Sequence, residues 1–170
     1  MKKSKVLENN IVTDSYYLIN LFTSDDKKVT QLHVQKLMYL FEAFYMCVKN
    51  VDSLYACNFN AWAFGPVSIP LYKAYKSFGN ANIVLTEEEK KKGSKVDKLK
   101  KDILKKVYEI FGELTASQLV NLTHKKGSPW YNKWMENNQE MVYGEDSYID
   151  KKETKEWFRN NFIVGEIEDE

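Results

Sequence analysis

The side chains best suited to nucleophilic or acid–base chemistry in this chain are two histidines, His33 and His124, and two cysteines, Cys47 and Cys57. The histidines lie about ninety positions apart, and neither belongs to a nucleophile elbow or a glycine-rich turn. Each histidine therefore fits a structural role near a helix end better than a catalytic one. A small hydrolase built on His124 is the enzymatic alternative, and it requires a nucleophile within hydrogen-bond reach of that ring.

Motifs that would hold a metal, a phosphate group or a cofactor are missing from the sequence. The chain has neither the HExxH nor the CxxC spacing of zinc sites, and its seven glycines are scattered without a GxxxxGK or GxGxxG loop. Two cysteines give no disulfide framework, which is typical of a reduced cytoplasmic compartment. We therefore expect no enzymatic activity, no catalytic residues, no cofactor, no metal and a cytoplasmic location.

One carboxylate, Glu42, interrupts the otherwise apolar run 37–48. A lone acid among such neighbours could have a perturbed pKa and serve as a proton donor or acceptor. At about 100° per residue, however, Glu42 falls on one narrow helical stripe with Gln31 and Gln35. This position favours a solvated carboxylate without a catalytic function.

The segment Gln31–Lys49 is the element around which the rest of the chain is expected to fold. Thr30 is a good N-cap, and no glycine or proline interrupts the segment. The apolar run is too short, and its flanks are too polar, for a membrane span. We expect a central buried helix, in which Lys36 either extends its amine to solvent or forms a buried ion pair.

Shorter elements are predicted on both sides of this helix from caps, periodicity and turn residues. Residues 1–10 are predicted to form a polar arm, and Thr13 or Asp14 is predicted to begin a helix that ends near Phe22. Further along the chain we predict a strand within 54–64, a helix over 67–78, an amphipathic helix over 96–110, short helices after Thr115 and Ser128, a strand or extended loop over 141–149 and a final helix after Asp150.

The predicted fold is mostly α (α+β): a compact bundle of about six or seven helices around one central buried helix, with a small two- or three-stranded β element. No linker or composition change divides the chain. We therefore expect a single domain over residues 1–170, with its core at about 13–163, a polar N-terminal arm and an acidic C-terminal tail.

The charges nearly cancel over the chain, with 25 basic and 24 acidic side chains. The whole-protein field thus gives no reason to expect nucleic acid or an acidic membrane as a partner. The segment 86–106 is an exception, because its nine lysines and five acids give a local charge of +4. It could bind nucleic acid, and the first helix pair could be a helix-turn-helix. Apolar residues recur there at three and four positions, so a solvated helix face explains the lysines more simply.

Several short motifs follow one another along the chain. LHVQKLMY (32–39) lies on the central helix, FNAWAFGPV (59–67) continues into PLY (70–72), and LTH (122–124), PW (129–130) and SYI (147–149) come before the last helix. Their order and spacing resemble the Panacea antitoxin domain of SocA-like, phage-associated proteins. The residues that carry this resemblance are Lys36, Leu37, Tyr39, Trp62, Gly65, Pro66, Val67, His124, Pro129 and Trp130.

The resemblance implies a mostly helical antitoxin that neutralises a cognate toxin, encoded beside it, by direct protein contact. Some members of the family pass the bound toxin to a protease, which would be a cytoplasmic protease here. The alternative function is a nucleic-acid-binding transcriptional regulator of phage or toxin–antitoxin genes. A turn at Gly65 and Pro66 and the bulk of Trp62 and Trp130 suggest that the motif residues are mainly structural. The partner surface is then predicted among side chains that the motifs leave exposed: Tyr72, Tyr75, Lys76, Trp134, Tyr143 and Trp157.

Overall fold

The computed structural model describes residues 2–162 of the chain, with side chains from Ile11 onward. Within this range it contains eight α-helices and one two-stranded antiparallel sheet, which confirms the predicted mostly α fold with a small β element. The elements follow in the order α1 (Lys2–Ser24), α2 (Gln31–Lys49), β1 (Phe59–Trp62), β2 (Gly65–Ser68), α3 (Ile69–Tyr75), η1 (Lys76–Phe78), α4 (Glu87–Ser94), α5 (Lys98–Phe111), α6 (Ala116–Thr123), α7 (Pro129–Glu136), η2 (Gly144–Ser147) and α8 (Lys151–Asn161).

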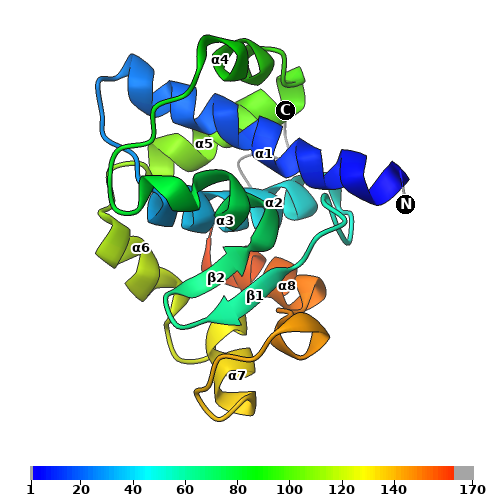
Figure 1. Ribbon diagram of the computed structural model, residues 1–170. Coiled ribbons are helices and arrows are strands. Elements are labelled where there is room, and N and C mark those ends of the chain that lie inside the picture. The colour runs from blue at the N-terminus through cyan, green and yellow to red at the C-terminus, as the bar shows by residue number, and fades with distance from the viewer. Residues whose placement is uncertain (1, 163–170) are drawn as a thin grey trace.

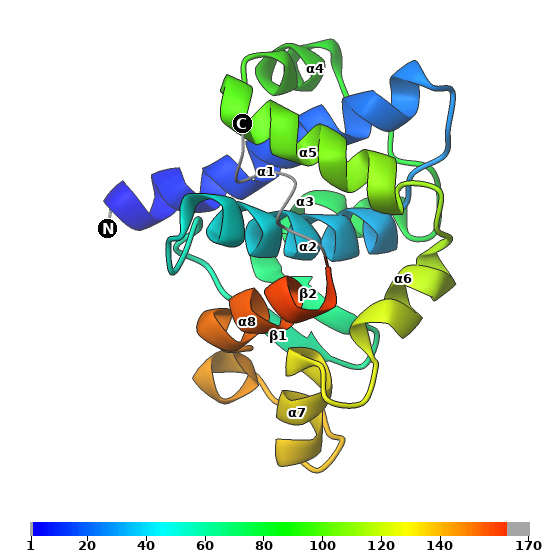
Figure 2. The ribbon, with the colours of Figure 1, turned by 180° about the vertical axis from the view of Figure 1, so that it is seen from behind.

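Helix α2 crosses the middle of the molecule, as the sequence predicts. Helices α1 and α5 lie on one side of it, and the β-hairpin and α8 lie on the other (Figure 1, Figure 2). Every side chain of residues 34–44 is buried, so α2 is covered around most of its circumference. It presents no wide polar face, which a recognition helix would need to enter a major groove.

The polar stripe on α2 is not solvated, and the prediction of a wet face is wrong for Gln35 and Glu42. Their exposed fractions are only 4% and 3%. The sequence reasoning treated the helix in isolation, whereas strand β2 lies over Gln35 and the loop after α2 folds back over Glu42. Both side chains form hydrogen bonds there, which offset the free-energy cost of burying them.

Helix α1 begins at Lys2, and the prediction that this helix starts at Thr13 or Asp14 is therefore wrong. No glycine or proline precedes Ser24, and the leading residues include several lysines, a leucine and a glutamate, which favour helix. Thr13 and Asp14 lie inside this helix and do not cap it. The predicted acidic tail, residues 166–170, lies outside the described residues.

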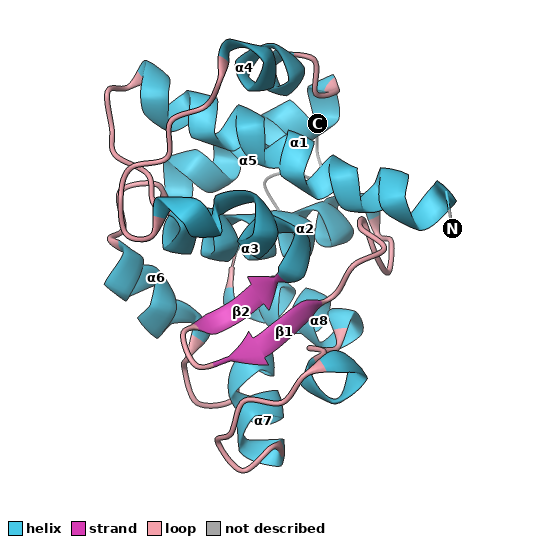
Figure 3. Cartoon of the chain, in the orientation of Figure 1, coloured by secondary structure: helices cyan, strands magenta, loops and turns pink. Residues whose placement is uncertain are grey.

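The β-hairpin is shorter and tighter than the predicted strand over 54–64. Its two strands pair from Phe59↔Ser68 to Trp62↔Gly65, so only two residues form the turn between them (Figure 3). Helix α3 begins at Ile69 rather than at residue 67, because residues 65–68 are taken up by β2. Pro70 lies in its first turn, as predicted.

The lysine-rich segment forms two helices, α4 and α5, that are separated at residues 95–97. The predicted caps of α6 and α7 are confirmed, since Thr115 and Ser128 accept hydrogen bonds from backbone amides three residues later. Residues 141–149 form a 3₁₀ turn and one isolated bridge to β1 instead of a strand. At the end of α5, the side chain of Phe111 is buried and that of Ile110 faces solvent.

Candidate interaction surface and the cluster beneath it

The free edge of strand β2 is occupied by the side chain of Gln35 from α2. Its amide nitrogen donates to the carbonyl of Ser68 at 2.9 Å, and its amide oxygen accepts from the Ser68 N–H at 2.8 Å. One side-chain amide thus replaces a neighbouring strand at this point. Because both backbone groups of Ser68 are satisfied, the hairpin is fixed to the central helix.

Lys36, the next residue on α2, is completely buried. Its Nζ donates to the carbonyl of Pro66 at 3.0 Å, so the amine neither reaches solvent nor forms the predicted buried ion pair. Burial lowers the pKa of the Lys36 amine to about 7, because an ammonium loses its hydration there. The side chain acts as a hydrogen-bond donor to the hairpin.

Gly65 provides the space that this lysine needs. A Cβ atom at Gly65 would lie 2.7 Å from Cε of Lys36 and 3.0 Å from the hydroxyl of Thr123. Its φ of +107° is also a conformation that other residues rarely adopt. Glycine is therefore required here both by the backbone and by the close approach of α2 and α6 to the hairpin.

His124 and Trp130 close the cluster from the other side. Their rings stack with centroids 3.5 Å apart and an interplanar angle of 3°, and Trp130 Nε1 donates to the carbonyl of Trp62 at 2.7 Å. Burial, together with the charge of Lys36, lowers the pKa of His124 to about 4. The structure thus brings Lys36, Trp62, Gly65, Pro66, His124 and Trp130 into one cluster. Leu37, Tyr39, Val67 and Pro129 are buried as well.

The ring of His124 does not have the surroundings of a catalytic base. Its Nε2 is buried without a hydrogen-bond partner among the described residues. The two hydroxyls nearest in sequence donate to backbone carbonyls, Thr123 to Val120 and Ser128 to Thr123. The arrangement therefore gives no positive support to the hydrolase hypothesis.

Glu42 anchors the loop that follows α2. One carboxylate oxygen, Oε2, accepts hydrogen bonds from the N–H groups of Leu54 and Tyr55, at 3.2 and 2.9 Å, and pairs with Lys151 at 2.9 Å. The same lysine also donates to the carbonyl of Tyr55. This buried acid is hydrogen-bonded and paired with a cation, which is the arrangement expected of a structural group.

An apolar groove of about 480 Å³ opens beside the hairpin turn. Its walls come from the start of α2, the turn between the strands, α3 and the segment before η2, and its lining contains no charged side chain. The residues that line it are Gln31, Leu32, Gln35, Trp62, Ala63, Phe64, Val67, Tyr72, Asn80 and Met141.

Exposed aromatic side chains surround this groove. Phe64 is 67% exposed and Tyr143 is 74% exposed. The ring of Trp62 meets Tyr72 and Tyr143 edge to face, with centroids 6.0 and 5.8 Å apart. We refer to Trp62, Phe64, Tyr72 and Tyr143 as the aromatic patch.

The structure places the six predicted partner residues in different surroundings. Tyr72 and Tyr143 belong to the aromatic patch, and Lys76 is exposed on η1, directly after α3. Trp134 and Trp157 are half-buried, each against other aromatic rings. The prediction that Tyr75 is exposed is wrong, because it is buried and hydrogen-bonded to Ser15.

Sequence reasoning missed Phe64 and Met141 as surface residues. Phe64 belongs to the FNAWAFGPV motif, and its place between Trp62 and Gly65 was the available signal, since a two-residue hairpin turn points its side chains outward. Met141 gave no such signal, because only the fold of the segment after α7 brings it to the groove.

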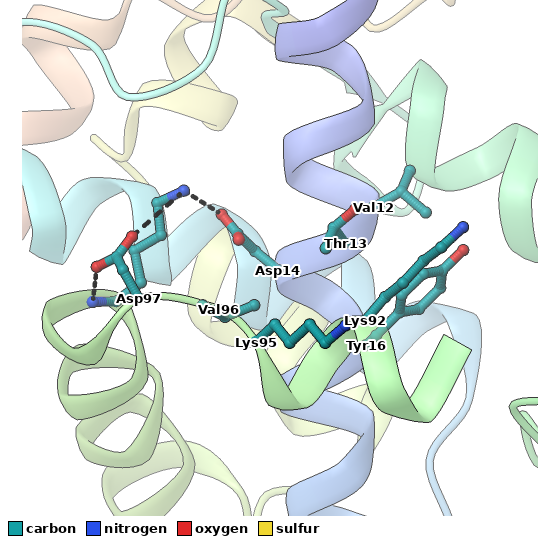
Figure 4. Close-up of a pocket in the computed structure, with 9 residues that line it drawn as sticks. Val12, Thr13, Asp14, Tyr16, Lys92, Lys95, Val96 and Asp97 are labelled. Carbon is teal, nitrogen blue, oxygen red and sulfur yellow. Dashed lines mark hydrogen bonds and ion pairs between the residues drawn. The ribbon is translucent and has the colours of Figure 1, made fainter. Parts of the chain in front are cut away.

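A larger cavity, of about 760 Å³, lies where α4 and α5 meet α1 (Figure 4). Lys100 bridges two carboxylates there, with Nζ 3.1 Å from Asp14 and 3.9 Å from Asp97. Asp14 also accepts a hydrogen bond from the hydroxyl of Tyr55 at 2.5 Å. Burial raises the pKa of Asp14 although its partners oppose the shift. Asp14, Asp97 and Lys100 thus pair with one another, which is typical of a structural network.

Two absences concern residues 2–162, the part of the chain that the structure describes. No group of three or more histidine, cysteine, aspartate or glutamate side chains is placed to hold a metal ion. Among the helices described, none is long and apolar enough to cross a bilayer.

Comparison with known proteins gives one finding. A family model described as "Antitoxin SocA-like, Panacea domain" matches residues 34–131, which is more than half of the chain. The match contains every residue of the cluster around Lys36 as well as Phe64 and Tyr72. No curated protein and no solved structure matches the chain.

Proposed function

We propose, from the premise that this chain belongs to the SocA-like antitoxin family with its Panacea domain, that it binds a cognate toxin by direct protein contact and thereby neutralises it. The observation that carries this proposal is the uncharged groove with the aromatic patch beside it. A cluster of large, solvent-exposed aromatic side chains is typical of protein interfaces, where such side chains serve as anchors.

The rigidity of the hairpin supports this role. Gln35 and Lys36 fix β2 from one side, and Trp130 holds the carbonyl of Trp62 from the other. A turn held in this way presents Phe64 with little loss of conformational freedom on binding. The buried motif residues then act as positioning groups for an exposed anchor.

No catalytic step belongs to this proposal. Membership of an antitoxin family favours a non-enzymatic role, and Nε2 of His124 is buried without a hydrogen-bond partner among the described residues. We extend the proposal to the fate of the toxin, which would be passed to a cytoplasmic protease after binding. A shorter half-life of the toxin in cells that contain the antitoxin, and its recovery when energy-dependent proteases are deleted, would support this extension.

The alternative, a nucleic-acid-binding regulator, is weakened by how the lysines are used. Lys90, Lys92 and Lys98 each pair with an acid on their own helix. Lys100 is held between Asp14 and Asp97. A phosphate-binding surface needs cations that are free to replace counterions, and pairing with acids removes part of that capacity.

Co-expression with the product of the adjacent gene tests the proposed function. We expect the wild-type chain to restore growth, and a purified mixture to form a complex in isothermal titration calorimetry. Failure of the wild-type chain to bind that product would contradict the proposal.

A triple substitution, F64A/Y72A/Y143A, tests whether the groove is the contact surface. We expect it to weaken binding by about a hundredfold or more, because aromatic anchors dominate interface energies. The control is V84A/I110A, which truncates two exposed apolar residues away from the groove. Equal affinities of the triple variant and the wild type would show that the toxin binds elsewhere.

A further inference from the structure

We propose that the groove accepts a basic segment of the toxin, in which an apolar side chain lies next to arginine or lysine. This inference rests on the proposed function, and it adds the chemistry of the partner. It depends on the charges around the groove, on the aromatic faces that line it and on the state of the neighbouring strand edges.

One segment of the chain beside the groove is acidic. Residues 135–150 contain five acids and no lysine or arginine, although the whole chain is nearly neutral. Glu136 is paired with Lys133, and Asp150 caps α8. The other three, Glu140, Glu145 and Asp146, are exposed.

These three acids lie close to the aromatic patch. Glu140 directly precedes Met141, which lines the groove, and Glu145 is two residues from Tyr143. Two residues of chain span at most about 7 Å. The segment is also fixed against the sheet, because Tyr148 bridges Asn60 and η2 packs on β1. Glu140, Glu145 and Asp146 thus each lie within three residues of Met141 or Tyr143, and we call these three acids the acidic rim below.

The rings of Tyr72 and Tyr143 are arranged around Trp62. Tyr72 and Tyr143 both meet Trp62 at steep angles, 78° and 72°, so each tyrosine ring stands edge to face against the tryptophan. The face of an aromatic ring attracts cations, and tryptophan does so most strongly. With uncharged walls and an acidic rim, this place favours a cation that enters beside an apolar anchor. Lys73 and Lys76 follow Tyr72 in the chain and are exposed, whereas Lys36, next to Gln35, is buried.

Strand addition, a different mode of binding, is blocked at this site. An extended segment of the toxin could add to the sheet as a further strand. The edge of β2 is already occupied by Gln35 and Lys36, and β1 is bridged on its other side by Tyr148 and Ile149. Recognition at the hairpin must therefore use side chains rather than backbone pairing.

The test neutralises the acidic rim with E140Q/E145Q/D146N. We expect at least tenfold weaker binding of the toxin at about 50 mM salt, a slower association rate and a smaller loss of affinity with added salt. The matched control is E109Q/E156Q/D52N, which removes the same charges from exposed positions on α5, on α8 and in the loop after α2. We expect this control to bind like the wild type.

The outcomes separate this inference from the proposed function. If the wild-type chain binds the toxin and the rim variant binds as tightly as the control, the toxin is not recognised by its basic charge and this inference is overturned. If the wild-type chain does not bind the toxin at all, the proposed function fails instead.

A second probe works without the toxin. Fluorescently labelled peptides of alternating leucine and arginine should bind the wild-type chain, and peptides of alternating leucine and glutamate should not. Binding of both peptides, or of neither, would contradict the inference. Sedimentation that shows self-association abolished by F64A/Y72A/Y143A would assign the groove to a second copy of the chain and would also overturn it.

Discussion

At the scale of single residues, Lys36 has the most unusual surroundings. An amine that is completely buried pays a large cost of dehydration, and here a single hydrogen bond to the carbonyl of Pro66 opposes it. A hydrophobic residue would fit the same helix position without this cost. A lysine, unlike a hydrophobic residue, also satisfies the backbone carbonyl of Pro66 at the edge of the hairpin.

This burial makes the stability of the fold depend on pH. The ordinary pKa of 10.5 applies to Lys36 in the unfolded chain, and the folded value is about 7. Between these values the unfolded chain binds more protons, so the free energy of unfolding rises with pH by at most about 1.4 kcal/mol per unit. Below about pH 7 both states are protonated, and this contribution becomes constant.

The variant K36M removes this dependence. We expect the curves of unfolding free energy against pH for wild type and K36M to diverge between about pH 7 and 9.5, with the wild type gaining stability relative to the variant. Urea denaturation at several pH values measures this difference, and K105M, at an exposed position on α5, serves as the control. Parallel curves would mean that Lys36 is not buried as an amine.

Gly65 gives a second prediction at this scale. The substitution G65A combines a positive φ with a clash against Lys36, whereas G127A has a φ of +87° and open space around its Cβ position. We expect G127A to cost about 1 kcal/mol and G65A at least about 2 kcal/mol more, because only the latter displaces a packed neighbour. Equal losses in thermal or urea denaturation would show that the close approach of Lys36 contributes nothing.

At the scale of elements, the sequence predicted helices well and contacts between elements poorly. Caps such as Thr30, Thr115 and Ser128 act over three residues, so they can be read from a short stretch. The length of the hairpin and the burial of Glu42 depend on partners far along the chain, such as Gln35 for Ser68 and Lys151 for Glu42. No local pattern contains such pairs, and the predicted solvated stripe failed for this reason.

The same limit applies to the candidate site. The motifs suggested residues with a mainly structural role, and six of them, Lys36, Trp62, Gly65, Pro66, His124 and Trp130, lie together in the structure. The partner surface could be predicted only in part. Residue type favoured Tyr72 and Tyr143, which are exposed, and equally Tyr75, which is buried. Side chains on a short helix alternate between core and solvent within a single turn, and the direction of the core was not known from sequence.

The loop between α2 and β1 should depend on Glu42. We expect E42Q to cost about 3 kcal/mol, because it leaves Lys151 without its charged partner in a largely buried place. Amide hydrogen exchange at Leu54 and Tyr55, whose N–H groups bind Glu42, should accelerate more than exchange in α2. E109Q, on the exposed face of α5, should change neither. Unchanged exchange in E42Q would show that the loop is held by other contacts.

At the scale of the whole molecule, a net charge of +1 hides a separation of charges. The lysines gather on α4 and α5, whereas the acids of residues 135–150 lie near the hairpin, at the other end of the molecule (Figure 1). Such an arrangement orients a charged partner as it approaches. A basic toxin is guided toward the groove, and nucleic acid would be guided toward α4 and α5. The two candidate functions therefore predict opposite responses to charge changes at the two ends.

The variant K91Q/K95Q/K105Q/K106Q makes this comparison, because all four lysines are exposed on α4, α5 or the turn between them. We expect it to neutralise the toxin as well as the wild type, and to associate with it as fast or faster at about 50 mM salt, since a repulsive field for a basic partner is removed. We also expect the wild-type chain to cause no shift of duplex DNA at that salt concentration. A DNA complex that weakens steeply with salt and disappears in the lysine variant would instead establish the regulator, because only that function uses cations at this end of the molecule.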